Sequence, residues 1–269
     1  MQGIPGPLLY GTAWKEDATE GLTRLALDAG FRAIDTANQR RHYFEAGVGA
    51  AVAGAIRDGV VRRDELFLQT KFTSAGGQDH RLPYDPRADP AEQVRQSFAS
   101  SLEHLQTGTI DSYVLHGPSR RRGLAPEDIA VWQAMESLPV RFLGASNVAL
   151  DQLEQLCGIA AVPPTFVQNR CFAATGWDAE VRAFCRAHDI VYQGFSLLTA
   201  NLDELRKRAF REIVQRVGRT PAQVVFRFAL QIGIVPLTGT TSPAHMREDL
   251  AVETFELSAE DVARIERLA

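Results

Sequence analysis

The sequence lacks any apolar stretch close to the roughly 18 residues that a membrane-spanning helix needs. Its first ten residues, 1–10, lack the charged start, apolar run and small-residue cleavage site of a secretory signal. Cysteine is scarce: Cys157, Cys171 and Cys185 are odd in number and form no C-x-x-C pair. This excludes a disulfide scaffold and a zinc ribbon. We therefore expect a cytoplasmic protein with reduced, mostly buried thiols.

A strong charge of either sign is also missing. The 269 residues include 29 Lys or Arg and 33 Asp or Glu, a net charge of −4. The densest basic run, 120–122, is typical of a solvated loop rather than of a nucleic-acid footprint. The 45% hydrophobic content is ordinary for a globular protein, and no shift in composition marks a boundary. We expect one domain over residues 1–269 that binds neither nucleic acid nor membranes.

Short β-branched or aromatic runs alternate with amphipathic stretches along the whole chain. Such alternation predicts parallel βαβ units. The glycine-rich fingerprint of an open dinucleotide-binding sheet is absent after the first strand, and eight units favour closure into an α/β (β/α)8 barrel, a TIM barrel. Extra helices are expected near the C-terminus, over 205–217 and 258–268. The expected strands are 8–12, 31–36, 65–72, 109–116, 140–146, 164–169, 190–196 and 234–238.

Three consecutive strand ends carry ionisable residues: Asp35, Lys71 and His116. In a barrel, side chains at the carboxyl ends of the strands converge on one mouth. A purely structural role is the alternative, in which Asp35 and Lys71 form an ion pair at the rim and His116 is a hydrogen-bonded polar residue. However, a lysine is costly to bury unpaired, and the recurrence on three consecutive strands favours a catalytic site.

The chemistry of this set points to acid–base work on a carbonyl or an alcohol. The chain has no G-x-S-x-G nucleophile motif, and the ionisable residues are too few for a metal site, so we expect no metal. A lysine beside a tyrosine hydroxyl would lower the pKa of that hydroxyl. Tyr43, eight residues after Asp35, is the tyrosine within reach.

Polar and aromatic residues at the later strand ends suit a flat, phosphorylated ligand. Ser146, Asn147 and Gln168 offer amide-complementary donors and acceptors, and the aromatic face of Phe195 suits a flat ring. The segment TGTTS, 238–242, precedes a helix expected near Pro243 and offers hydroxyls and N–H groups to a phosphate. A plain capped turn is the structural alternative for that segment.

Six segments in this order resemble the aldo-keto reductase superfamily: GFRAIDTA with Tyr43, LFLQTKF, IDSYVLHGP, GASNV, FVQN and VPLTGTTSPAHMREDL. The resemblance spans 11–250 and implies an NAD(P)H-dependent reductase of aldehydes or ketones. In that case Tyr43 is the general acid, Lys71 paired with Asp35 tunes it, and His116 orients the carbonyl. NADPH is the expected cofactor and NADH the alternative. The implied partner is a small carbonyl compound, and the chain is expected to be a monomer or weak dimer.

The resemblance also implies a cofactor site. Ser146, Asn147 and Gln168 would hold the nicotinamide carboxamide, and Phe195 would stack on its ring. The other expected cofactor residues are Gly11, Thr12, Ser196, Thr238, Thr240, Thr241, His245, Glu248 and Asp249. Four residues that follow strand ends are expected at the substrate, namely Trp14, His80, Tyr84 and Trp177, with loop packing as the alternative for the two tryptophans. The long loop 73–90 is also expected to face the substrate.

The sequence departs from the family in places. The usual spacing from the aspartate to the tyrosine is five residues, so Tyr43 is aimed correctly only if the longer loop folds back. The family's lysine for the adenosine 2′-phosphate is lost and His245 stands for its arginine, which weakens the NADPH prediction. Two other functions stay open: a non-catalytic nucleotide-binding regulator or scaffold, and an isomerase or lyase with Lys71 as a Schiff-base former.

Overall fold

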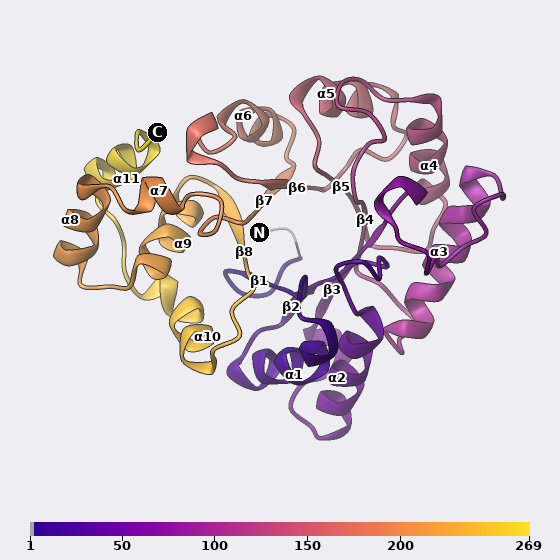
Figure 1. Cartoon of the computed structure of the whole chain (residues 1–269), viewed down its shortest axis with the longest axis horizontal. Coiled ribbons are helices and arrows are strands. Elements are labelled where there is room, and N and C mark those ends of the chain that lie inside the picture. Colours follow the sequence, from indigo (N-terminus) through magenta and orange to yellow (C-terminus); the bar gives the residue numbers. More distant parts are fainter. Residues whose placement is uncertain (1–2) are drawn as a thin grey trace.

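The computed structural model describes residues 3–269, whose strands form one closed parallel barrel (Figure 1). Each strand pairs with the next along the chain, and β8 closes the barrel against β1. The predicted (β/α)8 architecture is therefore confirmed. The strands are β1 (Leu9–Gly11), β2 (Ala33–Asp35), β3 (Phe67–Phe72), β4 (Ser112–Leu115), β5 (Phe142–Ser146), β6 (Phe166–Arg170), β7 (Val191–Phe195) and β8 (Ile234–Thr238).

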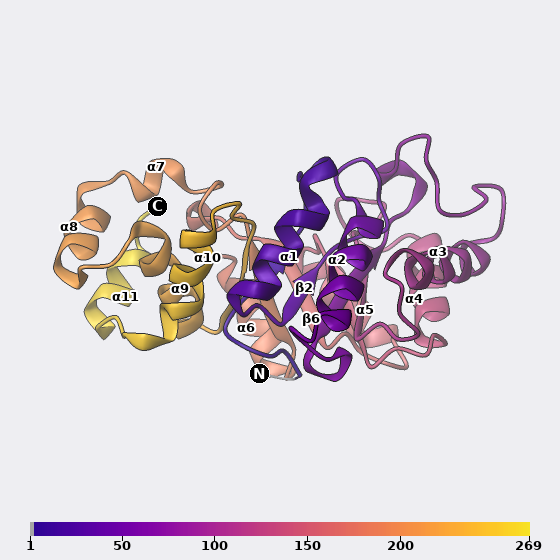
Figure 2. The same ribbon diagram turned by 90° about the horizontal axis from the view of Figure 1, so that it is seen from below.

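The helices surround the barrel. After β1 to β6 come α1 (Thr19–Ala29), α2 (Glu45–Arg57), α3 (Pro90–His104), α4 (Pro126–Glu136), α5 (Leu150–Ile159) and α6 (Ala179–Ala187). After β7 and β8 come α7 (Leu202–Leu205), α8 (Arg208–Val217), α9 (Pro221–Gln231), α10 (Pro243–Leu250) and α11 (Ala259–Glu266), which gather on one side (Figures 1 and 2). The expected extra helices near the C-terminus are thus present. None of the helices within 3–269 is long and apolar enough to cross a membrane.

Local sequence signals explain where several helices begin. Thr220 caps α9 by accepting a hydrogen bond from the Gln223 amide N–H, and the Gln223 side chain accepts one from the Thr220 N–H in return. Pro221 then occupies the first helical position, where its missing N–H costs nothing. Ser258 caps α11 in the same way through the Asp261 N–H.

The barrel interior is layered because every second residue of a strand faces inward. The lowest layer is apolar and includes Phe67, Phe166 and Val235. Two residues further along β3 and β6, Gln69 and Gln168 replace the phenylalanines, and the register places them level with Asp35 and Gln193. Lys71 follows on β3. A polar layer thus separates the apolar floor of the barrel from its mouth.

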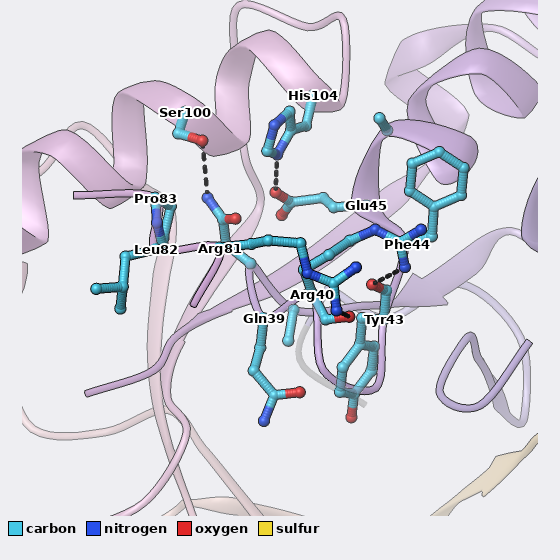
Figure 3. A pocket seen from close by; sticks show the side chains of 13 residues that line it. Gln39, Arg40, Tyr43, Phe44, Glu45, Arg81, Leu82, Pro83, Ser100 and His104 are labelled. Carbon is cyan, nitrogen blue, oxygen red and sulfur yellow. Dashed lines mark hydrogen bonds and ion pairs between the residues drawn. The ribbon is translucent and has the colours of Figure 1, made fainter. Parts of the chain in front are cut away.

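The start of α2 packs against the end of α3 (Figure 3). Glu45, at the first position of α2, is buried and is hydrogen-bonded to His104 Nδ1 at 3.0 Å. Gly49, one turn later, lies so close that an added Cβ would be 1.9 Å from the carbonyl oxygen of His104. At Gly54 on the same helix an added Cβ would meet only arginine side-chain nitrogens, at 3.5 Å or more. A methyl group thus fits at Gly54 but not at Gly49.

We predict that Gly49→Ala destabilises the protein by about 1–3 kcal/mol, because the new methyl group forces α2 away from α3. Gly54→Ala on the same helix should instead stabilise it by about 0.4–1 kcal/mol, through the lower entropy of the unfolded chain. Urea unfolding of the two variants and the parent measures both effects. Equal midpoints for the two variants would contradict the close approach at Gly49.

Candidate active site

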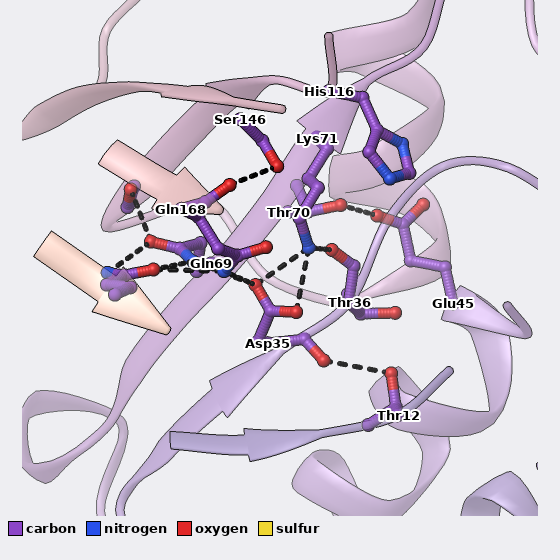
Figure 4. Close-up of polar contacts among 12 residues, drawn as sticks. Thr12, Asp35, Thr36, Glu45, Gln69, Thr70, Lys71, His116, Ser146 and Gln168 are labelled. Carbon is purple, nitrogen blue, oxygen red and sulfur yellow. Dashed lines mark hydrogen bonds and ion pairs between the residues drawn. The ribbon is translucent and has the colours of Figure 1, made fainter. Parts of the chain in front are cut away.

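Lys71 and Asp35 form an ion pair that is almost completely shielded from solvent (Figure 4). Lys71 Nζ lies 2.7 Å from both carboxylate oxygens of Asp35 and donates a third hydrogen bond of 2.7 Å to the Thr36 carbonyl. Burial lowers the pKa of Lys71, while the Asp35 charge opposes that shift. Three acceptor oxygens therefore match the three hydrogens of a lysine ammonium, which favours the charged form over the free amine that Schiff-base chemistry needs.

A layer of side-chain amides supports the carboxylate from below. Asp35 Oδ1 accepts hydrogen bonds from Gln69 Nε2 at 2.7 Å and from Gln168 Nε2 at 2.9 Å. Both amides also donate to Gln193 Oε1, and Ser112 Oγ donates to Gln69 Oε1. The sequence analysis missed Gln69 and Gln193. The sequence feature that pointed to Lys71, a polar residue inside an otherwise apolar strand, could also have pointed to these two glutamines.

The lengthened loop after β2 folds back into a turn that brings Tyr43 to the mouth. The Tyr43 amide N–H donates to the Gln39 carbonyl at 3.0 Å, which closes the turn. Gln39 Nε2 donates to the Gly77 carbonyl at 2.8 Å, and the Trp14 N–H donates to the His42 carbonyl at 2.7 Å. The loop is therefore tied to the loops after β1 and β3. In Figure 3 the Tyr43 ring points away from the α3 side of a cavity of about 400 Å³ behind this loop.

The structure brings the four predicted catalytic residues together. The Tyr43 ring centroid lies 5.3 Å from Lys71 Nζ and 5.8 Å from the His116 ring centroid. The expectation that Lys71 lowers the pKa of Tyr43 is wrong here. Burial, reinforced by the Asp35 charge, raises that pKa. The physical reason is that burial disfavours the phenolate and the Asp35 carboxylate repels it, while the Lys71 ammonium is directed to both oxygens of Asp35.

His116 is held as a neutral imidazole. Burial, the Lys71 charge and His42 lower its pKa to about 3. His116 Nδ1 lies 2.6 Å from Thr73 Oγ1, and the backbone carbonyl of His116 accepts a 2.8 Å hydrogen bond from Asn147 Nδ2. Thr73, two residues after Lys71 at the start of the long loop, is a site residue that the sequence analysis did not identify.

The predicted carboxamide-binding residues lie together at the ends of β5 and β6. Ser146 Oγ donates to the Gln168 carbonyl at 2.7 Å and accepts a hydrogen bond from Asn147 Nδ2 at 3.1 Å. Asn147 is exposed and has a positive φ of 54°, whereas Ser146 and Gln168 are buried. The amide nitrogens of Asn147 and Gln168 are engaged within the protein. Their contact with a carboxamide stays a prediction.

Two of the residues that were predicted to bind the phosphates of the cofactor point into the protein. Thr238 Oγ1 donates to Asp249 Oδ2 at 2.7 Å, and both side chains are buried, so they are not presented to a ligand as expected. Burial raises the pKa of Asp249 to about 6. The other predicted cofactor residues of this segment reach the surface: Thr241 and His245 are exposed and Thr240 and Glu248 half-buried, next to the start of α10, where Ser242 is the N-cap.

Lys15 reaches the same segment from the loop after β1. Its Nζ donates a 2.7 Å hydrogen bond to the Gly239 carbonyl and lies 5.1 Å from the ring centroid of Tyr10. Only 7% of Lys15 is exposed, and burial lowers its pKa to about 8. Among residues 3–269 it makes no ion pair with a carboxylate. The sequence analysis missed Lys15, although the chain has only three lysines and their scarcity was a usable signal.

Four further predicted cofactor residues flank this region. Gly11, at the end of β1, lies against the end of β8: an added Cβ would be 3.5 Å from the Thr238 carbonyl oxygen. The hydroxyl of Thr12 is not presented to a ligand, because it is buried and donates to the Asp35 carbonyl at 3.0 Å. Phe195 and Ser196, at the end of β7, are half-buried.

The predicted substrate residues divide into two pairs. Trp14 is 71% exposed and its ring packs on His42, with centroids 4.0 Å apart, while His80 is exposed on the loop after β3. The prediction for Tyr84 is wrong: it is buried, stacks on Phe72 and donates to the Thr73 carbonyl. The prediction for Trp177 is also wrong, because it is fully buried and its indole N–H donates to the Ile265 carbonyl.

Comparison with known proteins is consistent with this geometry. A sequence model described as the aldo/keto reductase family matches residues 9–269. Aldo-keto reductase family 1 member C3 of Pongo abelii is 29% identical over 92% of this chain and 81% of its own. The putative methylglyoxal reductase DkgA of Salmonella typhi is 27% identical over 97% of this chain and 89% of its own.

Solved structures share the fold. An aldo/keto reductase from Brucella melitensis has a TM-score of 0.83 at 26% identity, covering 99% of this chain and 94% of that one. An aldo-keto reductase solved in complex with NADPH has a TM-score of 0.82 at 25% identity, covering 97% of this chain and 84% of that one.

We predict that Asp35→Asn destabilises the protein by about 3–5 kcal/mol, because it leaves the Lys71 ammonium buried without a counter-charge. Adding Lys71→Met should recover part of that loss, since the second change removes the unpaired charge. Urea unfolding at neutral pH measures both. Arg208→Gln is the control, because it breaks an exposed pair with Glu212 and should cost less than about 1 kcal/mol. A double variant less stable than Asp35→Asn alone would refute the prediction.

Proposed function

This chain belongs to the aldo/keto reductase family of oxidoreductases, and on that premise we propose that it reduces small aldehydes or ketones to alcohols with NADPH, with Tyr43 as proton donor. The observation that carries the proposal is the meeting of three groups at the mouth. The Tyr43 ring lies 5.3 Å from Lys71 Nζ and 5.8 Å from the His116 ring, although the loop before Tyr43 is longer than usual in the family.

The residues at the mouth fit a nicotinamide dinucleotide. Lys15 is a buried cation that has no carboxylate partner within residues 3–269, and it lies beside the backbone of Gly239, where a phosphate would give it an anionic partner. Ser146 and the amide oxygens of Asn147 and Gln168 suit the carboxamide, and Phe195 suits the ring. When bound, NADPH supplies the hydride that the carbonyl carbon receives.

Tyr43 and His116 determine how the carbonyl oxygen receives its proton. The raised pKa of Tyr43 keeps its phenol protonated across the neutral range, so it has a proton to give to the carbonyl oxygen. The low pKa of His116 keeps its imidazole neutral, so one ring nitrogen can donate a hydrogen bond to the same oxygen without competing as an acid. The alcohol then leaves, and Tyr43 regains its proton from water.

An aromatic surface near the entrance supports the proposed class of substrate. Trp14 is largely exposed and its ring packs on His42 at a tilted angle, so the loops after β1 and β2 present an aromatic surface there. We propose small aldehydes and ketones, with methylglyoxal as the first to test because a relative carries that name. The test follows the loss of NADPH absorbance with methylglyoxal and then with a panel of aldehydes and ketones.

Each result of that test is decisive. Turnover with NADPH supports the proposal, and turnover with NADH alone reverses the choice of cofactor while preserving the reaction. NADPH binding without turnover across the panel would refute the proposed reduction and would favour a non-catalytic nucleotide-binding protein.

We predict that Tyr43→Phe lowers kcat by about 10²–10⁴-fold, because it removes only the proton donor. NADPH affinity, read by tryptophan fluorescence, should stay nearly unchanged. Tyr192→Phe is the matched control: this tyrosine is buried on β7, and its hydroxyl donates to Asp178, outside the proposed machinery. Retention of kcat in Tyr43→Phe would assign the proton to another group.

We predict that Lys15→Met weakens NADPH binding roughly tenfold to hundredfold, the range expected for losing a charged hydrogen bond worth about 1.5–3 kcal/mol. Lys15 carries its charge below its pKa of about 8 and loses it as the pH rises through that value. Parent affinity should therefore fall above pH 8, whereas Lys15→Arg should hold its affinity there because arginine stays charged.

Fluorescence titrations with NADPH and NADH across pH measure the role of Lys15. Equal losses for both cofactors in Lys15→Met would place the lysine at the pyrophosphate, and a loss for NADPH alone would place it at the 2′-phosphate. Unchanged affinity for both cofactors would show that Lys15 faces no phosphate.

A further inference from the structure

We propose that Thr73 is a positioning residue: its hydroxyl donates a hydrogen bond to His116 Nδ1 and so fixes the ring with its proton on Nε2, toward the substrate carbonyl. The inference deepens the proposed function of the same site and depends on it. Its basis is the 2.6 Å contact between Thr73 Oγ1 and His116 Nδ1 at the ends of two neighbouring strands.

The identity of the protonated nitrogen matters because His116 is neutral. A charged imidazole donates from both nitrogens, but a neutral one donates from one and accepts at the other. A carbonyl oxygen is an acceptor, so the nitrogen facing it must carry the proton. If Nδ1 instead carried the proton and donated to Thr73, Nε2 would present a lone pair to the carbonyl oxygen and repel it.

The backbone of His116 is held by hydrogen bonds on both sides. Only the rotation of its ring and its tautomer remain to be determined by other contacts. The His116 N–H donates to the Phe72 carbonyl at 2.9 Å, and the His116 carbonyl accepts from Asn147 Nδ2 at 2.8 Å. These contacts hold the backbone only. In the part of the chain that the structure describes, Thr73 is the residue whose side chain is hydrogen-bonded to the imidazole, so it supplies the missing restraint on the ring.

Thr73 is itself held from three sides. Its carbonyl accepts a hydrogen bond from the Tyr84 hydroxyl at 2.8 Å and another from Gln78 Nε2 at 3.3 Å. Its methyl group packs against Gly77, where an added Cβ would lie 2.7 Å from Thr73 Cγ2. Tyr84 is in turn stacked on Phe72. The two hydrogen bonds hold the backbone of Thr73 and the Gly77 contact holds its methyl group, so its hydroxyl can hold an imidazole in one orientation.

Two substitutions separate the hydroxyl from the shape of the side chain. Thr73→Val keeps the branched shape and the contact with Gly77 but removes the donor. Thr73→Ser keeps the donor and removes the methyl group. We expect kcat for methylglyoxal reduction to fall about 10–100-fold in Thr73→Val, in line with the loss of an orienting partner. KM and NADPH affinity should change little, and Thr73→Ser should recover most of kcat.

A spectroscopic readout does not depend on turnover. Imidazole ¹⁵N shifts of the cofactor-free protein, assigned with His116→Asn, report which ring nitrogen carries the proton. We expect protonated Nε2 in the parent and in Thr73→Ser, and a mixture of tautomers in Thr73→Val. Tyr84→Phe removes one restraint on Thr73 while keeping the aromatic stack, and it should produce a smaller change of the same kind. If Thr73→Val does not fold, Tyr84→Phe still tests the proposal.

The outcomes separate this inference from the proposed function. A parent His116 protonated on Nδ1 would overturn the positioning role, as would an unchanged kcat in Thr73→Val. A parent with protonated Nε2 that turns over no carbonyl compound would leave the hydrogen bond intact and refute the reductase reaction instead.

Discussion

The buried ion pair of Lys71 and Asp35 is the constraint around which the mouth of this barrel is arranged. Removing two charges from water costs several kcal/mol per ion unless excellent geometry and further hydrogen bonds compensate. The protein provides both. The ammonium has the Thr36 carbonyl as a third acceptor, and the carboxylate has amides from Gln69 and Gln168. The polar layer inside the barrel is thus explained by the ion pair above it.

Burial and the charges of the same ion pair together shift the pKa values of the neighbouring side chains. Burial, reinforced by the Asp35 charge, keeps the Tyr43 phenol protonated, and burial, reinforced by the Lys71 charge, keeps His116 neutral. Lys15 is the contrasting case, because it is buried at the mouth without a carboxylate partner among the described residues. Two of the three lysines of the chain are therefore buried at this mouth, one compensated by the protein and one suited to an anionic ligand.

The sequence predicted the barrel and the ionisable residues for a physical reason. Strand periodicity fixes which residues face inward, so Asp35, Lys71 and His116 could be assigned to one rim from their positions alone. Loop residues carry no such periodicity. Tyr84 and Trp177 pack inward, which buries their large apolar surface, whereas Trp14 in an equivalent position stays exposed. Thr73 and Lys15 were missed because spacing does not show where a loop side chain points.

The orientation of the Tyr43 side chain depends on contacts between loops rather than on the number of residues that separate it from Asp35. The turn that carries Tyr43 is tied through Gln39 to the carbonyl of Gly77. The same Gly77 packs against the methyl group of Thr73, which contacts His116. One short segment after β3 therefore holds both the proposed proton donor and the proposed hydrogen-bond donor. A longer loop after β2 is compatible with the site as long as its turn still meets that segment.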